Sequence, residues 1–250
     1  MREYSVGVDE AGRGPVIGPL IVCAMSIPSE DYSILNEMGV RDSKSLTKKK
    51  RESVYELLNE KAVERNWGVG IVVCEPSRID HNKLSSNLNL LEVDLFSEAI
   101  IDSIDNNKSG SIFLDACDVK QERFGNNVKL KLGDLWSDWR VVSEHSMDSS
   151  NALVSAASIV AKVTRDNAMQ KLSNDIGMEL GSGYPSDPKT RASMETLVSG
   201  KTPHDCLRWT WSTVERAWKD LHGTHVPVRD EKKIVSPQTD IRHWMEGNHK

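Results

Sequence analysis

The sequence is short of cysteine and of long apolar segments, and these two absences narrow the possible classes of protein. Its 250 residues include four scattered cysteines without a Cys-x-x-Cys pair, namely Cys23, Cys74, Cys117 and Cys206. This spacing argues against a zinc site or a disulfide framework and indicates buried or free thiols in a reducing compartment. No apolar run approaches the roughly 20 residues that a membrane span requires. The chain leads from Met1 directly into a predicted strand, which leaves no room for a signal peptide. We therefore expect a cytoplasmic protein without membrane contact.

An excess of positive charge is also missing. The 32 Lys and Arg residues are outnumbered by 37 Asp and Glu residues, and the formal net charge is −5. Overall charge therefore does not indicate a nucleic-acid-binding protein, although local basic patches can still bind phosphates. The length allows one large domain or two small ones, and 38% hydrophobic and 28% charged residues are ordinary for a globular chain.

Strand and helix patterns alternate along the first part of the chain, and the last part is helical. Apolar patterns predict strands near residues 4–8, 20–25, 67–73, 112–114 and 139–142, with the first two paired as a hairpin. Helical spacing and start signals predict helices after Thr47, over 91–104, from Asn151 into the 170s, from Asp187 and from Ser212. These elements predict an α/β fold over residues 1–222, with a mixed sheet flanked by helices and a helical C-terminal portion. Residues 223–250 are polar and aperiodic, which predicts a flexible tail.

The octet Val8-Asp9-Glu10-Ala11-Gly12-Arg13-Gly14-Pro15 is the most informative segment of the chain. Two adjacent carboxylates stand where the first predicted strand ends, and a turn with two glycines around an arginine follows. Hard divalent cations prefer carboxylate oxygens, whereas exposed backbone N–H groups and guanidinium groups bind phosphates. The combination suggests metal-assisted chemistry on a phosphodiester. A solvated strand end followed by a plain glycine turn accounts for the octet when it is taken alone.

Two further acids stand at informative places. Asp115 ends the apolar strand over 112–114, and Asp148 lies just before the long helix that begins near Asn151. Strand ends at one edge of a sheet converge, and clustered carboxylates repel one another unless cations neutralise them. Two Mg²⁺ or Mn²⁺ ions about 3.5–4 Å apart are a known solution in phosphoryl transfer. A turn residue and a helix-terminal anion would explain Asp115 and Asp148 singly, but together with the octet they favour a metal site.

Four segments resemble, in order and spacing, the motifs of the type 2 ribonuclease H family, ribonuclease HII, and especially of its archaeal branch. These segments are Asp9–Pro15, Arg41–Thr47, Ser155–Asp166 and Gly181–Pro188. The resemblance covers roughly residues 4–220 and implies a ribonuclease H-like fold. It also implies cleavage of the RNA strand of RNA–DNA hybrids and incision 5′ of single ribonucleotides embedded in duplex DNA. The products would carry 3′-hydroxyl and 5′-phosphate ends.

The resemblance also implies roles for individual residues. Two divalent cations, Mg²⁺ or Mn²⁺, would be held by the catalytic residues Asp9, Glu10, Asp115 and Asp148. The ribonucleotide sugar and its phosphate would be contacted by Gly12, Arg13 and Gly14, and Tyr184 would pack on the sugar at the junction of RNA and DNA. This division of roles is physically reasonable, because the 2′-hydroxyl alone marks a ribonucleotide within DNA and a glycine-flanked backbone can approach it closely.

The segment before the long helix departs from the family pattern. Members of the family usually carry Lys-Ala-Asp there and a proline four residues after the aspartate. This chain has Ser146-Met147-Asp148, and Ala152 stands at the proline position. Asp148 therefore keeps its place and loses a basic neighbour, which makes it the least secure of the expected ligands.

Several basic residues are candidates for contacts with substrate phosphates. Lys44 lies in the second family-like segment, and Lys162 and Arg165 lie in the third. The run from Lys48 to Arg51 fits either phosphate contacts or a solvated helix face.

The tail contains a second resemblance. Gln238-x-x-Ile241-x-x-Trp244-Met245 resembles the peptide that docks into the DNA sliding clamp, where apolar and aromatic side chains fill a pocket. Trp244 departs from the usual pair of aromatic residues in that peptide. A sliding clamp is therefore an expected partner, alongside RNA–DNA hybrids and ribonucleotide-containing duplex DNA.

Two alternative functions stay open from the residues. A different ribonuclease H-like nuclease, such as a junction resolvase, would use the same acids but would leave the Gly12-Arg13-Gly14 segment and Tyr184 unexplained. A non-catalytic protein that binds hybrids would not need acids at all four positions. Nothing in the sequence requires an assembly larger than a monomer.

Overall fold

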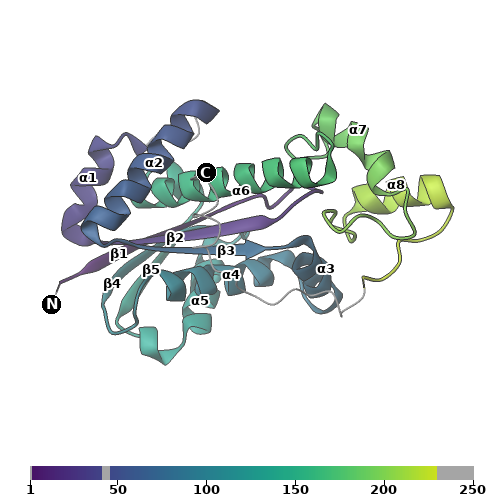
Figure 1. The fold of residues 1–250 in the computed structure, drawn as a ribbon. Coiled ribbons are helices and arrows are strands. Elements are labelled where there is room, and N and C mark those ends of the chain that lie inside the picture. Colours follow the sequence, from purple (N-terminus) through teal and green to yellow (C-terminus); the bar gives the residue numbers. More distant parts are fainter. Residues whose placement is uncertain (1, 41–45, 230–250) are drawn as a thin grey trace.

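A computed structural model describes residues 2–40 and 46–229 of the chain. Its centre is one mixed sheet with the strand order β3-β2-β1-β4-β5 (Figure 1). The strands are β1 (Tyr4–Ala11), β2 (Leu20–Pro28), β3 (Gly68–Cys74), β4 (Gly110–Asp115) and β5 (Trp139–Glu144). β1, β2 and β3 pair antiparallel in that order, whereas β4 pairs parallel with both β1 and β5. The predicted α/β fold, the five strands and the first hairpin are confirmed.

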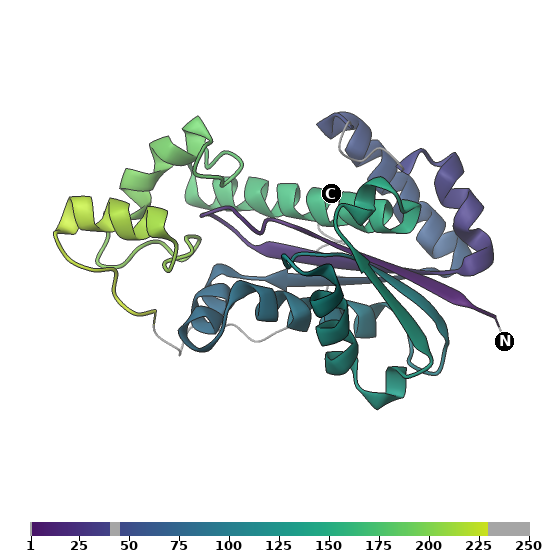
Figure 2. The same ribbon diagram turned by 180° about the vertical axis from the view of Figure 1, so that it is seen from behind.

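Helices cover both faces of the sheet (Figures 1 and 2). One face carries α1 (Tyr32–Glu37), α2 (Lys48–Arg65) and α6 (Ala152–Ile176). The other face carries α3 (Pro76–Ser85), α4 (Leu88–Ser103) and α5 (Gln121–Leu132). Beyond the far end of α6, a separate lobe contains α7 (Pro188–Leu197) and α8 (Ser212–His222). The described residues also contain three short 3₁₀ helices: η1 (Ser29–Asp31), η3 (Asp134–Trp136) and η4 (Met147–Ser149).

The alternation of side chains along β1 separates two hydrophobic cores, one on each face of the sheet. Val6 and Val8 are fully buried among residues of α4 and α5 on one face of the sheet. The intervening residues face α6, and Gly7 is the closest of them, because a Cβ there would lie 2.6 Å from the carbonyl carbon of Leu153. A helix can lie this close to a strand only where the strand has no side chain. Asp9 continues the row that faces α6.

The lobe of α7 and α8 has a core of its own, which includes Trp209, Trp218 and Leu180. It is joined to the loop after β1 by an isolated antiparallel bridge between Ile17 and Leu207. The helical C-terminal portion that the sequence predicts is therefore attached directly to the segment that follows the octet.

Three of the described α-helices, α1, α3 and α5, were not predicted from the sequence. α3 begins with Pro76 at its first position, which is a recognised start signal. α5 buries Phe124, Val128 and Leu132, which recur every four residues on one helical face. The signals for α3 and α5 are present in the sequence, but each helix is short and closely follows a strand.

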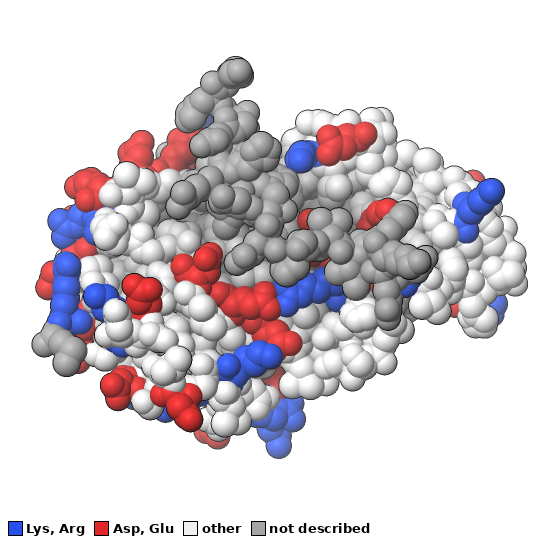
Figure 3. Space-filling view, turned by 60° about the horizontal axis from the view of Figure 1, so that its bottom comes forward, with Lys and Arg blue, Asp and Glu red and all other residues white. Residues whose placement is uncertain are grey.

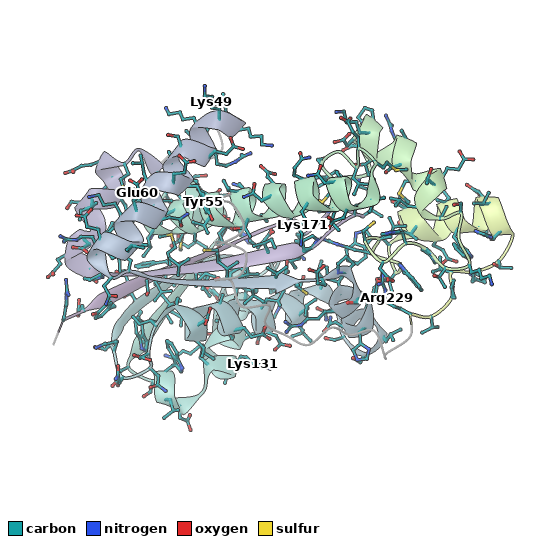
Figure 4. All side chains as sticks on the ribbon, viewed as in Figure 1. Lys49, Tyr55, Glu60, Lys131, Lys171 and Arg229 are labelled. Carbon is teal, nitrogen blue, oxygen red and sulfur yellow. The ribbon has the colours of Figure 1, made fainter. Side chains whose placement is uncertain are left out.

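The first residues of the predicted tail lie against the domain. Arg229, which is labelled in Figure 4, lies between α3 and the lobe of α7 and α8. Its guanidinium donates hydrogen bonds to a carboxylate oxygen of Asp80 at 3.1 Å and to the carbonyl oxygen of Leu207 at 2.6 Å. Residues 230–250, and with them the clamp-like peptide, lie outside the described residues. None of the described helices is both long and apolar enough to cross a membrane.

We expect Gly7→Ala to lower the free energy of unfolding by roughly 1–3 kcal/mol, because its methyl group overlaps the backbone of Leu153 and Val154. Urea unfolding would measure the change. Ser5→Ala, two residues earlier on the same face, is the control, because it removes only the hydroxyl contact with Ser29, worth about 1 kcal/mol. Equal costs for the two variants would contradict the close packing of α6 on β1.

Candidate active site

Asp9 lies at the end of β1 and is almost enclosed, with 5% of its surface exposed. Its Oδ1 accepts a hydrogen bond from the backbone N–H of Glu10 at 2.7 Å, and its carboxylate accepts another from the hydroxyl of Ser158 on α6. The parallel pairing of β1 with β4 places Val8 opposite Leu114. The next residue on each strand is an acid, so Asp9 and Asp115 lie side by side at the same edge of the sheet.

Asp9, Asp115 and Asp148 come together from three separate parts of the chain. Each offers a carboxylate oxygen, and these three oxygens lie within 4.8 Å of one another. The backbone N–H of Met147 donates to Oδ1 of Asp115 at 3.1 Å, which ties η4 to the end of β4 and sets the position of Asp148. The structure therefore brings together three of the four predicted ligands.

The crowding of these acids affects the pKa of Asp9. Burial, and secondly the charge of Asp115, raise the pKa of Asp9 well above its usual value. Burial also raises the pKa of Glu10. Carboxylates that are crowded and desolvated hold their protons more tightly unless a cation neutralises them. Three oxygen donors in this arrangement fit a hard divalent cation such as Mg²⁺ or Mn²⁺.

Glu10 lies beside this cluster and groups with a different set of side chains. An oxygen of its carboxylate, a carboxylate oxygen of Glu92 and Sγ of Cys117 lie within 4.8 Å of one another. Glu92 is fully buried, which raises its pKa to about 8, although the nearby Arg13 acts in the opposite direction. The backbone N–H of Arg13 donates a hydrogen bond to the Glu10 carboxylate and holds it at the edge of the cleft.

The acids lie in a cleft of about 340 Å³. Its lining consists of Asp9, Glu10, Ala11, Gly12, Arg51, Asp115, Asp148, Lys162, Arg165, Asp166 and Tyr184. Lys162 Nζ donates to the hydroxyl oxygen of Ser158 at 2.7 Å and lies 4.0 Å from Oδ2 of Asp148. α6 thus provides a basic neighbour for Asp148 where the segment before the helix does not.

Two loops meet at one side of the cleft. The N–H groups of Val16 and Ile17 donate to the carbonyl oxygen of Gly183 at 2.8 and 3.3 Å, which joins the loop after β1 to the loop of Tyr184. A Cβ at Gly14 would lie 3.3 Å from the ring of Tyr184, and this ring is 43% exposed. Gly12 has φ +96°, and a Cβ there would overlap the Arg165 side chain at 2.2 Å. The predicted sugar-contacting glycines and tyrosine are therefore neighbours.

The predicted substrate residue Arg13 is placed differently from its glycine neighbours. Its guanidinium donates to Oδ1 of Asn89 at 2.7 Å and to the carbonyl oxygen of Cys117, and it lies 3.3 Å from Glu92 Oε2. These contacts direct the side chain toward α4, so Arg13 stabilises the loop from beside the cleft.

Arg51 was not singled out by the sequence analysis, although it belongs to the basic run from Lys48. Lys48, Lys49 and Lys50 are exposed, and Figure 4 shows Lys49 at the outer end of α2. Arg51 instead lines the cleft and pairs with Asp166 at 3.1 Å. The signal was its spacing from the buried residues Val54 and Leu58, which places it on the inward face of α2. Lys44 lies outside the described residues.

Arg51 and Arg165 share a further property. The Nε atom of each is buried and has no hydrogen-bond partner within residues 2–40 and 46–229. Most buried polar atoms in proteins have a hydrogen-bond partner, and guanidinium N–H groups are strong donors to phosphate oxygens. On the face shown in Figure 3, the visible basic side chains are interspersed with acidic ones.

Comparison with known proteins identifies the family. The sequence model of ribonuclease HII matches residues 6–214. The chain belongs to the ribonuclease HII family. It is 39% identical over 222 residues to ribonuclease HII of Methanococcus maripaludis strain C5, covering 88% of this chain and 90% of that protein. It is 40% identical over 245 residues to ribonuclease HII of Thermococcus onnurineus, covering 96% and 97% of the two chains.

Solved structures agree with this membership. The crystal structure of ribonuclease H2 from Pyrococcus horikoshii superposes with a TM-score of 0.77 at 34% identity and covers 88% of this chain and 100% of that one. The structure of a complex of PCNA with ribonuclease HII from Archaeoglobus fulgidus gives a TM-score of 0.72 at 32% identity, covering 84% and 95%. As a ribonuclease HII, the chain is a type 2 ribonuclease H, a metal-dependent hydrolase that cuts the RNA strand of RNA–DNA hybrids. Membership in this family leaves no reason to favour a junction resolvase.

We expect Asp9→Asn to stabilise the metal-free protein at neutral pH, because burial and the charge of Asp115 raise the pKa of Asp9 and make its ionised form unfavourable in the folded state. The gain should disappear as the pH falls below about 4, the pKa of an unfolded aspartate, because Asp9 is then protonated in both the folded and the unfolded state. Thermal unfolding in a chelator, at a series of pH values, would measure this.

Adding Mn²⁺ should raise the melting temperature of the unmutated protein and have less effect on Asp9→Asn, because a ligand stabilises only the state that binds it. Equal shifts for both proteins would contradict the assignment of Asp9 as a ligand.

Proposed function

We propose that Asp9, Asp115 and Asp148 bind the divalent cations that this ribonuclease H requires, and that Glu10 completes the set from the edge of the cleft. The observation that carries the proposal is the meeting of three carboxylate oxygens within 4.8 Å at the end of β1. Mg²⁺ and Mn²⁺ both suit all-oxygen ligands, and we propose either as the cofactor. When bound, such cations neutralise charge on the phosphate and activate water for in-line attack at phosphorus.

The other residues of the cleft would bind and orient the substrate. Lys162, Arg165 and Arg51 provide positive charge on the side of the cleft formed by α6 and α2. We propose that they bind the phosphates on either side of the scissile bond, where the buried Nε atoms of Arg51 and Arg165 find acceptors. No histidine lines the described part of the cleft.

Recognition of the sugar would come from the two loops that meet at Gly14 and Tyr184. The exposed ring of Tyr184 can pack on a sugar, and the exposed backbone at Gly14 leaves room for a hydroxyl group to approach. We therefore propose incision 5′ of single ribonucleotides in duplex DNA in addition to cleavage of longer hybrids. The products would carry 3′-hydroxyl and 5′-phosphate ends. We propose that the protein acts in the cytoplasm as a monomer.

A duplex with one ribonucleotide, incubated with Mg²⁺ or Mn²⁺, should be cut on the 5′ side of that nucleotide. Asp9→Asn should lower kcat by roughly 10²-fold or more while binding of the hybrid persists, because the substitution removes a ligand charge and leaves the loops in place. Mapping of the cut by gel electrophoresis and a binding titration in Ca²⁺ would measure both.

Asp94→Asn is a matched control, because Asp94 lies on the surface of α4 and pairs with Lys131 outside the cleft. This control should keep full activity. Near-normal turnover by Asp9→Asn would contradict the assignment of the ligand, and binding without any cut by the unmutated protein would favour the non-catalytic alternative.

We further propose that the tail binds a DNA sliding clamp through Gln238, Ile241, Trp244 and Met245. The support is the resemblance of this segment to clamp-docking peptides and the relative from Archaeoglobus fulgidus whose structure is a complex with PCNA. Such a contact would bring the nuclease to newly replicated DNA, where embedded ribonucleotides are removed.

Deleting residues 236–250 should abolish capture of the chain by a sliding clamp and leave cleavage of a free duplex unchanged, because the described residues that line the cleft all lie between positions 9 and 184. Ile241→Ala with Trp244→Ala in the full chain is the finer variant. A protein without these residues that still binds the clamp would refute the proposal.

A further inference from the structure

Arg208 is a buried residue to which the proposed mechanism assigns no role. It follows the bridge between Ile17 and Leu207, and its relative exposure is 0%. All three guanidinium nitrogens donate to carbonyl oxygens of the loop after β1. Nη2 donates to Gly12 at 2.5 Å, Nη1 to Arg13 at 2.8 Å and Nε to Gly18 at 3.1 Å.

Burying the Arg208 guanidinium costs free energy. A guanidinium removed from water loses much of its solvation free energy, and a carboxylate partner usually compensates for that loss. Within the described residues, Arg208 forms no ion pair with a carboxylate, and its hydrogen bonds go to carbonyl groups alone. Its Cζ atom lies 5.1 Å from the centroid of the Trp211 ring. Burial, and secondly the charge of Arg165, lower the pKa of Arg208 to about 10. A guanidinium that is buried at this cost indicates that the protein needs the conformation of the loop after β1 that it stabilises.

The geometry of the peptide bond shows what that conformation provides. In a trans peptide the C=O and the following N–H point in opposite directions. Because Arg208 binds the carbonyl oxygens of Gly12 and Arg13, the N–H groups of Arg13 and Gly14 must face away from it. The first of these N–H groups does so, since it donates to the carboxylate of Glu10 at the cleft. The second belongs to Gly14, which is exposed and lies beside the ring of Tyr184.

We propose that Arg208 is the positioning residue of the sugar-recognition loop: by binding two successive carbonyl groups from behind, it directs two successive N–H groups toward the cleft. One of these groups orients Glu10, and the other is left for the ribonucleotide. Adjacent N–H groups that point the same way form a binding site for electron-rich oxygen atoms. The inference rests on the proposed role of this loop and adds the residue that sets its shape.

The test compares Arg208→Lys and Arg208→Met with Arg229→Met. Arg229 is a matched control, because it is a guanidinium in the same region that is 10% exposed and bonded to carbonyl and carboxylate groups but does not contact residues 12–14. Hydrogen exchange of the peptide that contains residues 12–14 would report the loop directly. We expect faster exchange there in both Arg208 variants and no change in Arg229→Met.

The second readout is the preference for the ribonucleotide. In Ca²⁺, the ratio of the Kd for an all-DNA duplex to the Kd for the same duplex with one ribonucleotide should fall roughly tenfold in the Arg208 variants, because small displacements of recognition groups have effects of this size. Arg229→Met should keep the ratio of the unmutated protein. A lysine reaches only one of the three carbonyl groups, so Arg208→Lys should resemble Arg208→Met although it keeps the charge.

The outcomes separate the two proposals. An unmutated protein without any preference for the ribonucleotide would overturn the proposed role of the loop. A clear preference that stays the same in a folded Arg208→Lys, together with unchanged exchange at residues 12–14, would overturn the role of Arg208 alone. If Arg208→Met does not fold, Arg208→Lys decides the question. If neither variant folds, amide resonances of Arg13 and Gly14 in the unmutated protein that do not respond to the ribonucleotide would likewise overturn the proposal.

Discussion

The parallel pairing of β1 with β4 is the constraint on which the site depends. It sets two acids, Asp9 and Asp115, at the same level at the ends of adjacent strands, and Asp9 is buried. Repulsion between them would open this edge unless cations or protons relieved it, so the fold supports an arrangement that is complete only with its cofactor. α6 adds Ser158 and Lys162 from one helical face, and Gly7 allows that helix to lie close enough to reach the acids.

Arginines give the other half of the cleft its shape. Arg165 lies between the loop after β1 and the loop of Tyr184 and donates to carbonyl groups of both, at Ile17 and Ser182. Arg208 holds the first of these loops from behind. Metal binding and sugar recognition are thus supported by different groups, carboxylates in one case and backbone amides set by guanidinium groups in the other. Glu10 connects the two, because it borders the metal cluster and accepts a hydrogen bond from the loop.

Much of the fold and of the metal site was predictable from sequence, because both depend on local patterns. Alternating apolar residues and acids at strand ends predict strands and their ends, and these ends must meet at one edge of a sheet. The direction of the Arg13 side chain was not predictable, since it depends on Asn89 and Glu92 of a helix some 80 residues away in sequence. The same holds for Arg208, which carries no motif of its own and whose partners are backbone atoms that look the same at every position. Arg51 could have been separated from its lysine neighbours by helical spacing, but only with knowledge of what α6 presents to it.

The hydrogen bonds of Arg208 also bear on the order in which the protein is built. They join residues separated by 195 and 196 positions in the chain. At roughly 5–20 residues per second, a ribosome needs about 10–40 s to make the intervening segment. During that time β1 and β2 can already pair, whereas the loop between them lacks the group that shapes it. The last of the clustered acids, Asp148, is also made before Arg208, so the carboxylates of the metal site are all synthesised before the residue that shapes the sugar-recognition loop.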